Sequence, residues 1–356
     1  MDDLDNSQSA ATSDFPHHDP DERPTLKTIA RLAGLAVPTV SRALNDAPDI
    51  GDETKRRVRE IATRIGYRPN RAGVRLRTGK TNVISLVLST EHDMMNHTAR
   101  LIASIAGTLR GSAYHLIITP YFPSEDPMDP VRYIVESGSA DGIIMNQTEP
   151  RDRRVAYLLE RDFPFVTHGR TEWEHPYADF DNGAFGDIAA EMLIRRGRRR
   201  LGLLRPPPLQ SYSIHLHEGA RIAAARHGCS LTVIEGATSD SPSKEIEAVI
   251  PRYLRGPGAL DGLIIPSATA VMAAIPAAED VGLEIGRDFD VAAKEAIPFL
   301  TRFRRPILTV GEDVGEAGLF LTRALMHRIA NPGAAPMQHL DVPVLPAGLG
   351  AGPILR

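Results

Sequence analysis

The feature that most constrains the fold is a regular alternation of short apolar runs and amphipathic segments along most of the chain. The apolar runs have the length of buried strands, and most intervals between them carry the apolar spacing of a helix. Such alternation favours parallel sheets that are covered by helices on both faces. The predicted strands are 83–88, 115–119, 142–145, 165–167, 201–204, 231–234, 262–265, 291–293 and 307–310, and the predicted helices include 99–109, 186–196 and 270–281.

The alternating region is too long for one doubly wound sheet, since it runs to about 260 residues. We therefore expect an α/β domain of two doubly wound subdomains over residues 82–346, with a cleft between them. Ligands of open parallel sheets bind beyond the carboxyl ends of the strands. The cleft is the expected ligand site.

An all-α pattern of three short, closely spaced helices precedes this region. Thr25 is placed to cap the first helix, and Gly34 is placed to end it. After a short turn, a second helix covers 37–44, with Pro38 in its first turn, where a missing N–H is tolerated. Asp52 begins the third helix. The predicted inward-facing residues are Ile29, Leu32, Ala33, Val40, Leu44, Val58, Ile61, Ala62 and Ile65.

Charge is segregated along the chain, although the net charge is only −4. Residues 21–80 hold 14 Lys and Arg against 7 Asp and Glu, whereas the remainder is acidic. A short basic segment joined to an acidic body is typical of a nucleic-acid-binding module attached to a domain with another role. A solvated, charged helix face would also account for the basic segment.

The first two helices and their short turn have the spacing of a helix-turn-helix, in which the second helix enters the major groove of DNA. Its outward residues are Val37, Pro38, Ser41 and Arg42. Arg42 can donate two hydrogen bonds to guanine, and Val37 and Pro38 can contact a thymine methyl group. For Arg42, a solvent-exposed charge without a DNA contact is the alternative.

These helical segments carry a resemblance to a known family. Residues 25–45 read TLKTIARLAGLAVPTVSRALN, residues 66–70 read GYRPN, and residues 70–77 continue as NRAGVRLR. They resemble the headpiece and hinge helix of the lactose-repressor (LacI) family of transcriptional regulators. The rest of the chain, apart from its acidic N-terminal tail, is similar to the periplasmic-binding-protein-like ligand domain of that family.

The resemblance implies roles for individual residues of the headpiece and hinge. Leu76 matches the leucine that paired hinge helices insert into the minor groove of DNA. Gly73 replaces the usual alanine in that helix at a cost of about 1 kcal/mol, so the hinge is expected to fold on DNA. Ala36 replaces the usual capping serine of the second helix. The remaining positions that match DNA contacts are Thr25, Val37, Pro38, Ser41, Arg42 and Asn45 for the operator, and Thr54, Tyr67 and Asn70 for phosphates.

The resemblance also implies that a small effector molecule binds between the two subdomains and reorients the hinges. Side chains that line sugar sites hydrogen-bond the sugar hydroxyls. For each candidate, a polar strand end without a ligand is the alternative. The candidates are Ser89, Glu91, Asn146, His168, Arg170, Tyr212, His215, Ser267, Lys294, Glu295 and Glu312.

Three elements of the ligand domain depart from the family pattern. Leu216 stands where an arginine usually precedes the glycine at Gly219. Ser267 and Ala268 replace an Asn-Asp pair, and residues 293–295 replace a Gly-aromatic-Asp element. The resemblance therefore implies a sugar or sugar derivative as the effector but does not identify it.

Features of other protein classes are missing from the sequence. We find no phosphate-cradling glycine motif, no nucleophile elbow and no closely spaced metal ligands, so we expect neither an enzyme nor a cofactor or metal. Cys229 is the single cysteine and cannot form an internal disulfide. No apolar run approaches the roughly 20 residues of a membrane-spanning helix, and no signal-peptide pattern is present, so we expect a cytoplasmic protein.

We therefore expect a homodimeric, nucleoid-associated repressor of carbohydrate uptake or catabolism genes. It would bind a palindromic operator of about 14 to 20 base pairs. The alternatives are a solute-binding protein, which the basic helix-turn-helix disfavours, and a corepressor-dependent regulator of non-sugar metabolism. The expected parts are a disordered acidic tail at 1–22, the DNA-binding domain at 23–69, the hinge helix and linker at 70–81, the ligand-binding and dimerisation domain at 82–346 and a tail at 347–356.

Overall fold

The computed structural model describes residues 24–68, 75, 79–90, 95–302 and 305–345. The chain divides between Thr81 and Asn82 into two compact units. Several predictions fall outside the described residues: both tails, most of the hinge, and the individual residues Asn70, Gly73, Leu76 and Glu91.

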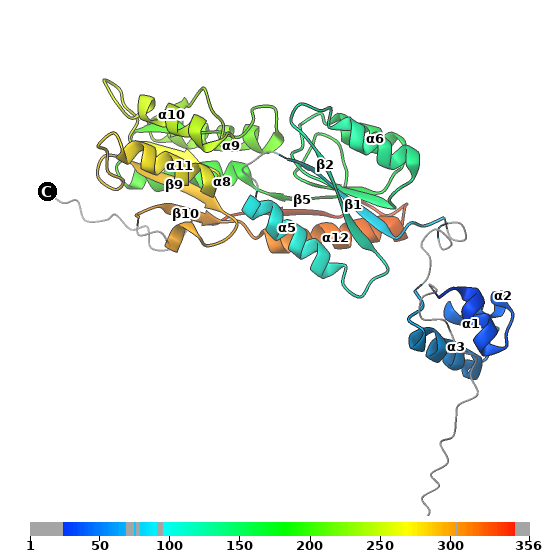
Figure 1. Ribbon diagram of the computed structural model, residues 1–356. Coiled ribbons are helices and arrows are strands. Elements are labelled where there is room, and N and C mark those ends of the chain that lie inside the picture. The colour runs from blue at the N-terminus through cyan, green and yellow to red at the C-terminus, as the bar shows by residue number, and fades with distance from the viewer. Residues whose placement is uncertain (1–23, 69–74, 76–78, 91–94, 303–304, 346–356) are drawn as a thin grey trace, which may run out of the picture. The chain divides into compact units, whose positions relative to one another are not determined.

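The first unit is a bundle of three short helices (Figure 1). Thr25 caps the first of them as predicted, because its hydroxyl accepts a hydrogen bond from the amide of Thr28 and the Thr28 hydroxyl accepts one from the amide of Thr25. Gly34 ends that helix at a φ of 65°, a left-handed conformation that glycine adopts without steric cost. The helices are α1 (Leu26–Ala33), α2 (Val37–Leu44) and α3 (Asp52–Arg64).

The core of this unit is small and apolar. Ile29, Val40 and Val58, one from each helix, have no exposed surface. Ala43 takes the buried position next to Val40, whereas the predicted inward residue Leu44 is only partly buried. The small side chain of Ala43 lets α2 lie close to its neighbours, and Leu44 covers the edge of the core.

The second unit contains two parallel sheets. The first has the strand order β11-β5-β4-β3-β1-β2, and the second has the order β10-β9-β8-β6-β7. All nine predicted strands are present, and β5 and β11 are additional. The strands are β1 (Val83–Ser89), β2 (His115–Tyr121), β3 (Gly142–Met145), β4 (Phe165–His168), β5 (Tyr177–Phe180), β6 (Arg200–Leu203), β7 (Ser230–Val233), β8 (Gly262–Ile265), β9 (Asp290–Glu295), β10 (Leu308–Gly311) and β11 (Gln338–Asp341).

Helices cover both faces of each sheet (Figure 1). In β1, Ile84 and Leu86 pack toward α5 and α12, whereas Val83 and Val87 pack toward α6 and α7. This burial on two faces is why the strand is apolar throughout. None of the described helices is both long and apolar enough to span a membrane. The helices are α5 (Met95–Thr108), α6 (Met128–Ser137), α7 (Arg153–Glu160), α8 (Asn182–Arg195), α9 (Ser211–Arg226), α10 (Ser243–Tyr253), α11 (Ala268–Glu279) and α12 (Val314–Ala330).

The chain passes between the two sheets three times. β5 of the first sheet leads into α8, which packs on the second sheet. β10 of the second sheet leads into α12, which packs on the first sheet. After β11 of the first sheet, the chain returns to the core of the second at Leu345. The first two crossings each begin at the carboxyl end of a strand.

Helices α8 and α9 meet backbone to backbone. A Cβ atom on Gly186 would lie 2.3 Å from the carbonyl oxygen of Leu216, and one on Gly219 would lie 2.0 Å from the carbonyl oxygen of Gly183. No side chain fits at either position. Leu216 itself is fully buried in the same core, which explains how an apolar residue is accommodated where the resemblance leads one to expect arginine.

We expect Gly219→Ala to lower the stability of the protein, because its methyl group would overlap the backbone of α8. Overpacking of this kind costs about 1–3 kcal/mol, and more where backbone must move. The matched control is Gly107→Ala in α5, where a Cβ meets open space. That change should be neutral or stabilising, since alanine favours a helix by about 1 kcal/mol over glycine. Thermal unfolding of the two full-length variants measures the difference, and equal melting temperatures would contradict the packing argument.

Candidate ligand-binding site and nucleic-acid interface

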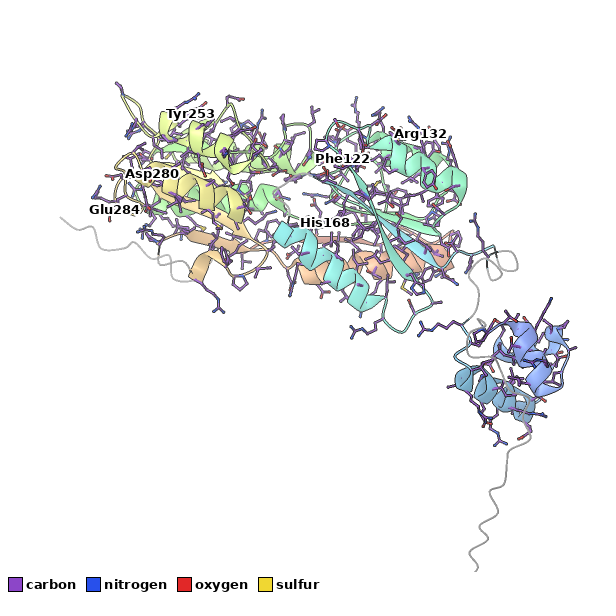
Figure 2. All side chains as sticks on the ribbon, in the orientation of Figure 1. Phe122, Arg132, His168, Tyr253, Asp280 and Glu284 are labelled. Atoms are coloured by element: carbon purple, nitrogen blue, oxygen red, sulfur yellow. The ribbon has the colours of Figure 1, made fainter. Side chains whose placement is uncertain are left out.

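A cavity of about 140 Å³ is lined by residues that end or follow strands of both sheets. His168, which Figure 2 labels between the two halves of the second unit, belongs to its wall. Six predicted effector residues line this cavity: Asn146, His168, Tyr212, Ser267, Lys294 and Glu312. Polar or charged residues that were not predicted also line it: His97, Gln147, Asp179, Asn182, Ser239, Asp240 and Thr269.

Lys294 and Glu312 form the charged centre of the cavity wall. Nζ of Lys294 lies 2.8 Å from Oε2 of Glu312 and 3.1 Å from Oδ1 of Asn182, and 4.9 Å from the centroid of the Phe180 ring. Burial acts to raise the pKa of Glu312, but Lys294 and His97 outweigh it and hold that pKa well below its ordinary value. Glu312 therefore carries its negative charge beside Lys294.

Two imidazoles face the other oxygen of the same carboxylate. Nε2 of His97 lies 3.6 Å from Oε1 of Glu312, and Nε2 of His168 lies 3.9 Å from it. The ring centroids are 5.1 Å apart. Burial, together with the nearby His97, lowers the pKa of His168 to about 3. His168 is therefore neutral at physiological pH.

Two acidic side chains complete the polar wall. Burial raises the pKa of Asp179 to about 6, although Nε of Arg170 lies 2.7 Å from its carboxylate. Burial also raises the pKa of Asp240, which accepts hydrogen bonds from the Tyr212 hydroxyl at 3.2 Å and the Ser239 hydroxyl at 2.8 Å. The carboxyl groups of Asp179 and Asp240 are thus engaged with neighbours in the protein.

Asn146 differs from these groups. Its side chain is 2% exposed, and neither Oδ1 nor Nδ2 has a hydrogen-bond partner among the described residues. A buried polar group without a partner costs about 1–3 kcal/mol, so such groups call for an explanation. In the wall of a cavity, the amide offers a bound molecule an acceptor oxygen and an NH2 group with two donor hydrogens.

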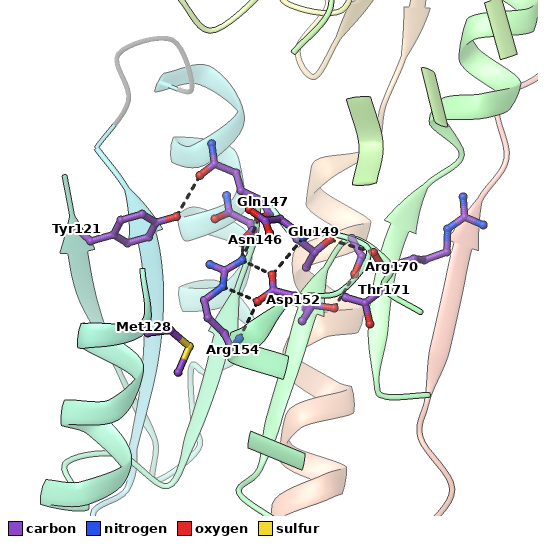
Figure 3. A network of polar contacts seen from close by, with 12 residues as sticks. Tyr121, Met128, Asn146, Gln147, Glu149, Asp152, Arg154, Arg170 and Thr171 are labelled. Carbon is purple, nitrogen blue, oxygen red and sulfur yellow. Dashed lines mark hydrogen bonds and ion pairs between the residues drawn. The ribbon is translucent and has the colours of Figure 1, made fainter. Parts of the chain in front are cut away.

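Arg154 fixes the strand end that carries Asn146 (Figure 3). Its Nη2 atom donates to the backbone carbonyls of Asn146 at 3.0 Å and Gln147 at 2.9 Å. The same atom lies 2.7 Å from a carboxylate oxygen of Asp152, and both side chains are buried. Gln147 has a φ of 51°, which is uncommon for a residue other than glycine. The buried guanidinium therefore holds an unusual turn that directs Asn146 into the cavity wall.

Glu295 is not part of the cavity lining, contrary to prediction. Its buried Oε2 atom accepts hydrogen bonds from the backbone amides of Phe299 at 3.0 Å and Leu300 at 2.8 Å, at the start of a 3₁₀ turn. Its carboxylate therefore caps a turn. Arg170 is also outside the lining, because its guanidinium turns toward Asp179.

The remaining predicted effector residues lie elsewhere. Ser89 ends β1 and His215 lies in α9, and neither lines the cavity. Glu91 falls outside the described residues. Two of the residues that sequence reasoning missed, Asp179 and Asn182, lie in or just after β5. That strand is four residues long and contains a buried acid, so its pattern did not indicate a strand.

Of the four residues on α2 that were predicted to face DNA, Pro38 and Arg42 are exposed, whereas Val37 and Ser41 are only partly exposed. Val37 packs against the core of the helical bundle. Val37 packs there because it begins the helix beside the other apolar residues. Arg42 forms an ion pair with Asp49, so contact with a base requires the guanidinium to leave that partner.

Other predicted DNA contacts have local roles in the isolated headpiece. The Thr25 hydroxyl takes part in the cap of α1, and Nδ2 of Asn45 donates to the carbonyl of Ser41. Thr54 lies in the first turn of α3 and is half-buried. The amide of Tyr67 donates to the carbonyl of Ala62 at 2.8 Å. These contacts hold the residues in place, and their contacts with DNA stay a prediction.

Comparison with known proteins agrees with both units. Residues 25–70 match the bacterial regulatory proteins of the lacI family, and residues 190–347 match a periplasmic binding protein-like domain. The HTH-type transcriptional regulator AglR of Rhizobium meliloti (strain 1021) is 33% identical over 88% of this chain and 90% of its own length. The regulator RafR of Escherichia coli is 36% identical over 57% of this chain and 62% of its own length.

Solved structures share the fold. The lac repressor dimer bound to operator and the anti-inducer ONPF matches with a TM-score of 0.77 at 17% identity, over 90% of this chain and 97% of that chain. A complex of the regulator CelR with cellobiose matches with a TM-score of 0.64 at 22% identity, over 90% of this chain and 98% of that chain. The predicted fold class is confirmed. With a helix-turn-helix headpiece, a two-sheet periplasmic-binding-protein-like domain and a relative that matches almost end to end, the chain belongs to the LacI family of DNA-binding transcription regulators.

Proposed function

We propose that this regulator represses genes of carbohydrate uptake or catabolism, and that a neutral sugar bound in the cavity controls its affinity for a palindromic operator. The observation that carries the proposal is the buried, unpartnered amide of Asn146 in a cavity whose charged groups are already paired. A family member with the same fold binds cellobiose in its solved structure, which supports a sugar as the ligand class.

The charge pairing favours an uncharged ligand. Lys294 is neutralised by Glu312 at 2.8 Å, and Arg170 lies 2.7 Å from Asp179. An acidic sugar would have to displace one of these carboxylates from its cation, at the cost of an unpaired buried charge. Neutral hydroxyl groups can hydrogen-bond the amide of Asn146 and leave both pairs intact.

The proposed oligomer is a homodimer. β2 is the edge strand of the first sheet, and its side chains Ile117 and Ile118 are each 45% exposed. Phe122, just after the strand, and Tyr133 in α6 are exposed as well. Apolar groups along an open sheet edge are typical of an interface. A second copy of the chain fits this surface, because a palindromic operator requires two headpieces related by a two-fold axis.

On DNA, α2 would lie in the major groove, and Arg42 would leave its ion pair with Asp49. Both residues are about half exposed, so little burial opposes the exchange. Exposed ion pairs contribute only about 0–1 kcal/mol, which a bidentate contact to guanine outweighs. The protein would act on nucleoid DNA in the cytoplasm.

Selection of operator DNA from a randomised pool, followed by thermal unfolding with a sugar panel, tests the proposal. We expect a palindromic sequence, and we expect neutral mono- or disaccharides to raise the melting temperature and to release the operator in a mobility-shift assay. A ligand that tightens operator binding would show a corepressor, and stabilisation by purines alone would contradict the sugar class. Failure to select any DNA sequence would contradict the proposed operator.

We expect Asn146→Leu to weaken binding of the most stabilising sugar by roughly tenfold to a hundredfold, because each lost hydrogen bond in a buried site costs about 1–3 kcal/mol. The sugar-free protein should be as stable as wild type or more stable, since an unpaired buried amide is removed. Isothermal titration and thermal unfolding measure the two effects. The control is Asn331→Leu at the exposed end of α12. Wild-type sugar affinity in Asn146→Leu would count against the assigned site.

Arg154→Met should lower the free energy of unfolding by about 3–5 kcal/mol, because it leaves Asp152 buried without its cation. The neighbouring Arg153 is the matched control: its ion pair with Asp126 at 2.9 Å is exposed, so Arg153→Met should cost at most about 1 kcal/mol. Denaturant unfolding of both variants measures the two losses of unfolding free energy. Similar losses in the two would show that Arg154 does not hold the turn at Gln147.

A further inference from the structure

Three side chains from distant parts of the sequence converge in the cavity wall. His97 belongs to α5, His168 ends β4, and Glu312 follows β10. If one possible ligand atom is taken from each side chain, the three atoms all lie within 4.8 Å of one another. No sequence motif marks this group, because the residues meet only where the crossing after β10 passes the carboxyl end of β4.

The contacts among these atoms are too long for hydrogen bonds. The His97 and His168 Nε2 atoms stand 3.6 and 3.9 Å from Oε1 of Glu312, whereas an N–H···O bond spans about 2.7–3.2 Å. A tetrahedral ion with bonds of about 2.0–2.2 Å holds its ligand atoms roughly 3.3–3.5 Å apart. The two contacts with Oε1 come close to this spacing, whereas the three atoms as a set lie only within 4.8 Å of one another, so the two imidazoles would have to approach each other by about 1 to 1.5 Å to surround a common ion.

The types of donor atom also fit a metal. Two imidazole nitrogens and one carboxylate oxygen are a donor set that zinc uses, with the fourth position left open. The three side chains lie in the cavity wall, so an open position would face the cavity.

The nearby ammonium group does not block the ion. Lys294 contacts Oε2 of Glu312, whereas the imidazoles face Oε1, so the carboxylate can serve both sides. Nζ of Lys294 also has a second partner, Oδ1 of Asn182, at 3.1 Å.

We propose that Nε2 of His97, Nε2 of His168 and Oε1 of Glu312 bind one divalent transition-metal ion of the zinc type in the cavity wall. Its open position faces the space where a ligand would lie. An effector hydroxyl in this open position would depend on the proposed function, whereas metal binding by the three side chains does not depend on it.

The test uses full-length protein dialysed against a chelator and then titrated with Co²⁺, in the absence of DNA and sugar. We expect one ion per chain with the visible absorption of a four-coordinate cobalt site, and displacement of the cobalt by Zn²⁺. His97→Gln, His168→Gln and Glu312→Gln should each weaken binding by about tenfold or more. The proposal would be overturned if wild-type protein gave no saturable cobalt signal, or if the three variants bound cobalt as tightly as wild type.

Two controls separate this site from other histidines. His227 lies 2.7 Å from Glu191 on the surface and offers a two-ligand pair, so His227→Gln should leave cobalt binding unchanged. The double variant His17→Gln/His18→Gln removes the adjacent histidines of the N-terminal tail and should also bind as wild type. Loss of binding in either control would assign the ion elsewhere.

A readout on the unmodified protein covers the case in which a variant does not fold. Crystals of wild-type protein grown with Zn²⁺ should give an anomalous-scattering peak among the three ligand atoms. A peak only at other positions would contradict the site. No operator or sugar is present in these experiments, so they test metal binding alone. Failure of the proposed function would instead appear in the mobility-shift and sugar-binding assays.

Discussion

The pairing of β11 with β5 and the packing of α12 on the first sheet oblige the chain to pass between its two sheets three times. The sites of the second unit depend on this constraint. The crossings after β5 and β10 place Asn182 and Glu312 beside residues that end strands of the other sheet. A single doubly wound sheet would leave its strand ends facing solvent, whereas here two sets of strand ends enclose one cavity.

Within that cavity, electrostatics and hydrogen bonding have separate roles. Lys294 and Glu312 form an ion pair, and the buried Asp240 accepts hydrogen bonds from Tyr212 and Ser239. The turn held by Arg154 instead presents Asn146 with its amide unused. Charge therefore stabilises the closed wall, and a neutral amide remains to recognise a ligand, which suits a molecule made of hydroxyl groups.

Sequence patterns predicted the elements whose burial is complete and failed where polar groups are buried. The apolar strands such as β1 and the caps of α1 followed from local rules, since these positions obey strand, helix and turn preferences. β5 was missed because it contains the buried Asp179, whose partner Arg170 comes from another segment. The position of Glu295 outside the cavity lining did not follow from its sequence, because its partners are backbone amides of a turn with no sequence signature. Long-range pairing of His97 with Glu312 is likewise invisible without the fold.

The backbone contact between α8 and α9 determines how the second half of this unit can respond to a ligand. Sliding one helix along the other would drive the Leu216 carbonyl into the Gly186 backbone, so shear within that layer is blocked. This contact favours movement of the layer as one piece over shear within it, so a response to a ligand in this half of the unit would fall on the segments that cross between the sheets.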